Sequence, residues 1–206
     1  MARVSLFGRW SDYQLSRLEV VFAIIVLLVL LSIFLNRMII ILAQAERALV
    51  ENSIVNMNSA LRVYTAHLQM TAGLQALADL QHVNPVPLLE QKSDRDLSTQ
   101  VESEQLATML RARTTAALPN YSGEMTEAEA VGLADGSWYF DPEQLALVYR
   151  IRSAEVFRSN LPGPSRIRYR LELDFEDRDG DGKFSPSVDQ FNTFSLKPLD
   201  DFQWLF

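Results

Sequence analysis

The sequence contains no cysteine and only two histidines, His67 and His82. Without cysteine the chain forms no disulfide and no cysteine-ligated zinc site. The two histidines lack the spacing of a metal-ligand or catalytic pair, and we find no nucleophile–base arrangement and no glycine-rich phosphate loop. The sequence therefore predicts that this protein is not an enzyme and has no small-molecule substrate.

Positive charge is also scarce, because 19 Lys and Arg stand against 26 Asp and Glu and the formal net charge is −7. Binding to a phosphate backbone needs a basic face, so we expect no nucleic-acid partner. Three arginines, Arg3, Arg9 and Arg17, precede the long apolar run. This bias predicts a cytoplasmic N-terminus and export of the residues after the run.

Only one run is apolar enough to cross a membrane. Val20–Ala43 is interrupted by Asn36 and Arg37 alone, and as a helix it would span about 36 Å, against about 30 Å for the hydrocarbon core. The sequence continues as a helix pattern with no cleavage site, which favours a retained anchor over a signal peptide. For Arg37 two interpretations stay open: it reaches the far interface with its charged end, or it pairs with a carboxylate of another membrane helix.

The helix pattern continues beyond the anchor, because no proline or glycine occurs between Val20 and Ala72. Intervals of three and four residues place one apolar seam on a helix face. The seam consists of Val50, Ile54, Met57, Leu61, Tyr64 and Leu68. It is either the helix's contact with its own domain or a surface for assembly with other subunits, and we name Ile54, Met57, Leu61, Tyr64 and Leu68 as the candidate interaction residues.

These patterns divide the chain into a cytoplasmic head (1–19), a transmembrane helix (20–43), its amphipathic continuation (44–72) and an exported α+β domain (73–206). In the first part of that domain we expect short helices and connections. They are a helix at Leu74–Leu80, an extended turn at Asn84–Leu89, an exposed loop at Glu90–Gln100, a helix at Val101–Leu118 and a turn at Pro119–Gly123.

From residue 136 the apolar period changes to two, which predicts strands. Ser137–Asp141 and Leu145–Ile151 form a predicted hairpin, Arg166–Phe175 alternates apolar and charged residues, and Phe191–Leu196 returns beside it. The aromatics of Asp200–Phe206 are expected to be exposed. The fold class is thus α+β, a long membrane-spanning helix packed on a small antiparallel sheet of about four strands at about 136–198.

One segment has the pattern of a metal site. Asp177, Asp179 and Asp181 alternate with other residues, Gly182 permits a sharp turn and Lys183 offers a backbone carbonyl, as in the opening of an oxygen-ligand calcium loop. The twelfth position is Val188, which offers no ligand, and either Asp189, one residue further on, or Glu176 would close the set in a different geometry. The segment is either a structural Ca²⁺ site or an acidic turn that binds no ion.

The order of these features resembles type IV pilins and type II secretion pseudopilins. In that family a glutamate near the start of the helix offsets the terminal amine of a neighbouring subunit, and Glu19 is the corresponding residue; otherwise it is the last charge before the membrane. The family's prepilin peptidase site has a glycine before a Phe-Thr-Leu-like segment. Here Tyr13–Leu18 precedes Glu19, so the resemblance does not imply cleavage.

Four segments also resemble, in the same order, the MSHA pilus biogenesis proteins of the MshF group. They are Asn84–Leu89, Pro119–Glu124, Gly136–Asp141 and Leu147–Arg150. The resemblance implies a bacterial inner-membrane protein with a periplasmic C-terminal domain, and it carries over no catalytic residue. Its implied partners are other pilin-like or pseudopilin subunits and assembly-platform proteins.

Two functions follow from these observations. The first is a pilin-like, single-pass component of a type IV (MSHA-type) pilus or a type II secretion-like assembly, which acts by helix packing with other subunits. The alternative is a membrane-anchored periplasmic binding or sensory module, whose sheet would recognise a ligand.

Overall fold

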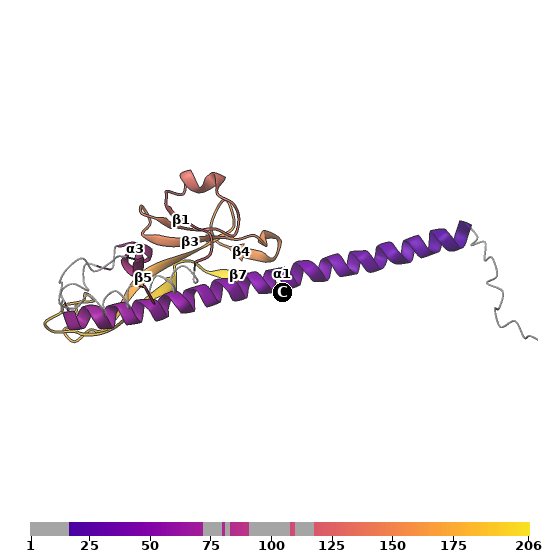
Figure 1. Cartoon of the computed structure of the whole chain (residues 1–206). Coiled ribbons are helices and arrows are strands. Elements are labelled where there is room, and N and C mark those ends of the chain that lie inside the picture. The colour runs from indigo at the N-terminus through magenta and orange to yellow at the C-terminus, as the bar shows by residue number, and fades with distance from the viewer. Residues whose placement is uncertain (1–16, 72–79, 81–82, 91–107, 110–117) are drawn as a thin grey trace, which may run out of the picture. The chain divides into compact units, whose positions relative to one another are not determined.

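A computed structural model describes residues 17–71, 80, 83–90, 108–109 and 118–206, in two compact units, 1–41 and 42–206. Helix α1, Arg17–Thr71, continues through both units (Figure 1). The predicted uninterrupted helix is therefore confirmed as far as Thr71, and its predicted last residue, Ala72, lies outside the described residues. The predicted helices at Leu74–Leu80 and Val101–Leu118 and the loop at Glu90–Gln100 lie almost entirely outside the described residues.

The segment Asn84–Leu89 is a helix start, and the prediction of an extended turn was wrong. Asn84 Oδ1 accepts the N–H of Val86 at 3.0 Å and caps helix α3, Pro85–Glu90. Asparagine is a strong N-cap and proline is favoured at the first helical position, so this pair begins a helix. Val86 and Leu89 are buried, so this helix packs its apolar side chains into the main core.

Five strands form the main sheet in the order β1-β2-β3-β5-β6. They are β1 (Tyr121–Glu124), β2 (Trp138–Asp141), β3 (Ala146–Arg150), β5 (Arg166–Glu176) and β6 (Gln190–Pro198). The β2–β3 and β5–β6 pairs are antiparallel, as expected. Strand β1 pairs parallel to β2, so the sheet is mixed, and the prediction of a purely antiparallel sheet was wrong at this edge.

A second, two-stranded sheet joins β4, Phe157–Ser159, to β7, Phe202–Trp204. The Phe157 ring lies 5.8 Å from the Phe202 ring and 5.1 Å from the Trp204 ring. Phe202 and Trp204 are therefore partly buried against the core, whereas we expected exposed aromatics here. Short 3₁₀ turns, η2 (Glu129–Gly132) and η3 (Ala154–Val156), connect the strands.

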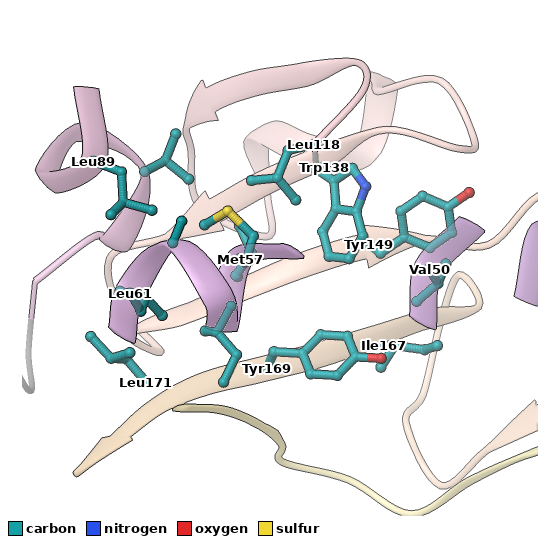
Figure 2. Packing of buried hydrophobic residues seen from close by; sticks show 14 of the residues in the cluster. Val50, Met57, Leu61, Leu89, Leu118, Trp138, Tyr149, Ile167, Tyr169 and Leu171 are labelled. Carbon is teal, nitrogen blue, oxygen red and sulfur yellow. The ribbon is translucent and has the colours of Figure 1, made fainter. Parts of the chain in front are cut away.

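The main core lies between α1 and one face of the sheet (Figure 2). Trp138 of β2, Tyr149 of β3 and Tyr169 of β5 pack beside one another, with the Trp138 ring 4.8 Å from Tyr149 and 6.2 Å from Tyr169. A smaller cluster of Ala130, Tyr139, Ala146 and Val148 covers part of the other face. The second unit is thus a helix layer, a sheet layer and a thin cover.

Strand β5 follows the predicted alternation on its apolar side, but its charged side is not wholly solvated. Arg166 is 5 % exposed, because it pairs with Glu127 at 2.5 Å and donates to the carbonyls of Pro162 and Pro164. Arg168 makes two hydrogen bonds to the Asp200 carboxylate. Arginine side chains are seldom buried unless the guanidinium group is paired with a carboxylate in this way.

Candidate functional site

The first unit carries a candidate membrane anchor. Of the described helices, α1 is the one that is long and apolar enough to cross a membrane, and no residue of its most apolar part is buried. A core helix of a soluble domain would bury such residues. Glu19 lies in the first turn of α1, and Arg37 lies in its exposed apolar part. Both predicted residues therefore lie in the candidate membrane segment.

The predicted seam faces the sheet of its own domain. Met57 and Leu61 are 0 % and 1 % exposed (Figure 2), and Ile54, Tyr64 and Leu68 are partly buried against the same core. Of the two interpretations of the seam, the contact with its own domain is the one that this packing matches. Because the domain covers Met57 and Leu61, neither offers a surface to another subunit in this fold.

A buried carboxylate that the sequence analysis missed holds α1 to the sheet. Glu46 is 7 % exposed, and its Oε1 accepts the Tyr149 hydroxyl at 3.1 Å and the Arg152 N–H at 2.7 Å. Its Oε2 accepts the Ser153 N–H at 2.9 Å. The signal was present in the sequence, since Glu46 lies four residues before Val50 and so continues the seam.

A second polar contact joins the helix to the edge of the sheet. Asn58 Oδ1 accepts the N–H of Leu196 in β6 at 2.7 Å. Strand β6 is an edge strand of the sheet, so its outward N–H groups have no strand partner among the described residues. The contact satisfies one of these groups and fixes the register of α1 along β6.

On its other side, α1 leaves an exposed and uncharged row in the second unit. Spaced by three and four residues, the row consists of Ala45, Ala48, Asn52, Val55 and Ser59. Val55 is 64 % exposed and is the largest apolar side chain of the row. This outer row is the part of the helix that another helix can approach.

The acidic loop connects β5 to β6, and the carboxylates of Asp177, Asp179 and Asp189 converge there. Their nearest oxygens all lie within 4.8 Å of one another. Two oxygens on opposite sides of one Ca²⁺ are separated by about the same distance, because each lies about 2.4 Å from the ion. Asp189, predicted as the closing ligand, therefore lies as close to Asp177 and Asp179 as two ligands of one Ca²⁺ lie to each other.

Asp181 does not belong to this group of three carboxylates. Its Oδ1 accepts the N–H of Lys183 at 2.7 Å instead. The structure thus brings together Asp177, Asp179 and Asp189 of the predicted ligands, and differs from the linear calcium-loop pattern at Asp181.

Backbone N–H groups shape the loop and determine its electrostatics. The N–H groups of Gly182 and Gly180 donate to Asp177 at 2.9 and 2.6 Å, and they lower the pKa of Asp177. Both glycines have positive φ, +73° and +76°, which glycine adopts without strain. The Asp181 N–H lowers the pKa of Asp179, but desolvation and the charges of Asp181 and Asp189 outweigh it, so the net shift is upward.

Phe184 fixes the loop on the sheet. Its ring lies 5.5 Å from Phe175 of β5 and 6.2 Å from Phe191 of β6. Asp189 is 6 % exposed and accepts the N–H groups of Arg178 and Ser185. The loop therefore combines a fixed frame, three converging carboxylates and oxygen-only chemistry, which fits Ca²⁺ better than softer metals.

Comparison with protein-family models found no matching family, and comparisons with curated proteins and with solved structures found no significant match.

Proposed function

We propose that this chain is a pilin-like, single-pass inner-membrane component of a type IV (MSHA-type) pilus or a type II secretion-like assembly. The observation that carries the proposal is the change of environment along α1. Its apolar side chains are exposed in residues 17–41, and one face is buried against a sheet in residues 42–71. Such a helix serves both as an anchor and as the support of an exported domain.

Helix packing with other subunits would then use what α1 leaves exposed. In the membrane this is the apolar surface around Glu19 and Arg37, and in the periplasm it is the outer row that contains Val55. Uncharged and mostly small side chains allow two helices to approach closely. Assembly through the outer row leaves the core seam intact.

We also propose that Asp177, Asp179 and Asp189 hold a structural Ca²⁺. The ion would offset the repulsion of carboxylates that converge within 4.8 Å of one another. Its role would be to fix the β5–β6 connection, since no described residue near the loop suggests catalysis.

Site-specific photo-crosslinking in native membranes tests the assembly function. A photoreactive residue at Val55 should give adducts with pilin-like subunits or assembly-platform proteins, identified by mass spectrometry. The matched control is the same residue at Leu61, which is buried in its own domain and should react only within the chain. If Val55 gives no adduct with such proteins, the assembly function is wrong, and the anchored binding module becomes the better explanation.

A further inference from the structure

Within the second unit, Glu46 lies on α1 close along the chain to the end of the apolar run, and it contacts the sheet domain there. Its contacts with the N–H groups of Arg152 and Ser153 hold the connection between β3 and β5 against α1. Glu46 follows Ala43, the end of the apolar run, by three residues, or about 4.5 Å of helix. Since the headgroup layer is about 5–8 Å thick on each side of the bilayer, the covalent connection keeps the two residues that Glu46 contacts, Arg152 and Ser153, within reach of this layer.

The residues after β7 lie at the same end. Leu205 donates its N–H to the carbonyl of Val156 at 2.8 Å, beside η3. The side chains of Leu205 and Phe206 are 37 % and 44 % exposed. Figure 1 shows β4 and β7 together at one end of this unit, while β5 extends to its other end. We call residues 152–165 together with Leu205 and Phe206 the membrane-proximal end.

Exposed positive charge accompanies these apolar side chains. Arg152 and Arg158 are both exposed, and no carboxylate of the described residues lies within ion-pair distance of either. The Arg152 Nε donates to the carbonyl of Asp135 at 3.2 Å. Because side chains alternate along a strand, Arg158 points away from the ring cluster of Phe157. Residues 152–165 contain two arginines and one acidic residue, Glu155, and are thus positive in a chain of net charge −7.

We propose that the membrane-proximal end lies on the membrane surface and binds anionic phospholipid headgroups. Arg152 and Arg158 bind lipid phosphates, which suit the planar guanidinium group. Leu205 and Phe206 enter the boundary between headgroups and acyl chains, as apolar side chains of interfacial segments do. This inference depends on the proposed membrane anchoring, and it adds that the lipid surface orients the periplasmic domain.

The test uses the full chain in vesicles and a fluorescent label on a single cysteine, since the chain has none of its own. Asn160→Cys places the label at the membrane-proximal end, and Ser187→Cys places it in the exposed β5–β6 connection as the matched control. A nitroxide on lipid headgroups quenches labels close to the surface. In vesicles of equal parts phosphatidylcholine and phosphatidylglycerol, we expect quenching at position 160 to exceed that at 187 by about threefold, because the quencher acts only near the headgroup layer.

Charge variants test the role of the arginines. In the Asn160→Cys background, Arg158→Glu should reduce the quenching in anionic vesicles to about half or less, and Arg158→Lys should restore it, because the attraction depends on positive charge near the surface. Arg62→Glu has the same charge change at an exposed position further along α1, and it should leave the quenching unchanged. In vesicles of phosphatidylcholine alone, Arg158→Glu should have no effect.

Flotation of the vesicles distinguishes a failure of the lipid-binding proposal from a failure of the proposed membrane anchoring. If the chain floats with the vesicles but positions 160 and 187 are quenched equally, or quenching is the same with and without the anionic lipid, the lipid-binding proposal is wrong and the anchor stands. If the chain does not float with the vesicles, the membrane anchoring itself is wrong, and the lipid-binding proposal with it.

Discussion

Glu46 shows how one side chain connects the helix to the sheet. Two of its three hydrogen-bond donors are backbone N–H groups of consecutive residues, Arg152 and Ser153, and the third is the hydroxyl of Tyr149. A carboxylate is seldom this well buried unless hydrogen bonds replace its lost hydration. The residue therefore stabilises one relative position of α1 and the β3–β5 connection.

The first prediction concerns the loss of this carboxylate. Glu46→Ala leaves three donors without their acceptor, and since an unsatisfied buried donor costs about 1–3 kcal/mol, we expect the free energy of unfolding to fall by about 3 kcal/mol. The thermal midpoint, followed by tryptophan fluorescence of the full chain in detergent, should fall by about 6–12 °C. Glu51→Ala is the matched control, because Glu51 pairs with Arg47 on the exposed side of the same helix and such pairs contribute little. Equal shifts in the two variants would contradict the role of Glu46.

The second prediction concerns high pH. Burial raises the pKa of Tyr149 above its usual value of 10, and the nearby Glu46 charge raises it further; burial and the Glu51 charge do the same for Tyr169. Above pH 10 the unfolded chain loses protons that the folded chain retains, so this stabilisation is complete below pH 10 and is lost as the pH rises toward the folded-state pKa. Absorbance at 295 nm and near-ultraviolet circular dichroism, recorded together, should show these tyrosines ionising as tertiary structure is lost. Ionisation of all six tyrosines near pH 10 with tertiary structure intact would refute the prediction, and Tyr149→Phe should weaken the dependence of stability on pH above 10.

Among the elements, the long and regular ones could be predicted from the sequence. Helix α1 has no proline or glycine to end it, and β5 alternates over most of its length, so the local pattern alone determines each. Strands β4 and β7 have three residues each. Their formation depends on ring contacts between residues that are 45 or more positions apart, such as Phe157 and Phe202, which no local pattern reveals.

The residues of the candidate sites, like the elements, could be predicted only where a local pattern in the sequence reveals them. Asp177 and Asp179 belong to a local pattern, and their closeness was predictable. The separation of Asp181 from the group was not, because it depends on which backbone N–H groups each carboxylate accepts. Glu46 was missed because its partners lie more than 100 positions away in the chain.

The third prediction tests which residues are the Ca²⁺ ligands: those of the linear calcium-loop pattern, which includes Asp181, or the three carboxylates that converge in the fold. If Asp177, Asp179 and Asp189 hold Ca²⁺, calcium at about 100 times its dissociation constant stabilises the domain by about 2.7 kcal/mol, and chelation should lower the thermal midpoint by about 5–10 °C. Asp179→Asn should remove most of this difference, and Asp181→Asn, the matched control, should retain it. An identical midpoint with calcium and with chelator would show that the loop is an acidic turn without an ion.

In the whole molecule, the two parts of α1 differ in whether their apolar side chains are exposed or buried in a core. The side chains that fill the core begin at Ala43, whereas the apolar side chains of residues 18–35 are exposed. The stability of the second unit should therefore not depend on the sequence of the apolar segment. A pilin-like assembly and an anchored binding module differ in what that segment must do.

The fourth prediction uses this difference. We expect replacement of Val20–Leu35 by an unrelated apolar helix of equal length to keep the chain in the membrane and to leave the thermal midpoint of the domain within about 2 °C, since core packing is unchanged. If the protein assembles by helix packing, the adducts from a photoreactive residue at Val55 should nevertheless fall sharply, because packing between membrane helices depends on the shape of their side chains. Adducts that persist at full yield would mean that the segment is only an anchor. The partner contacts would then belong to the exported domain alone, as a membrane-anchored binding module requires.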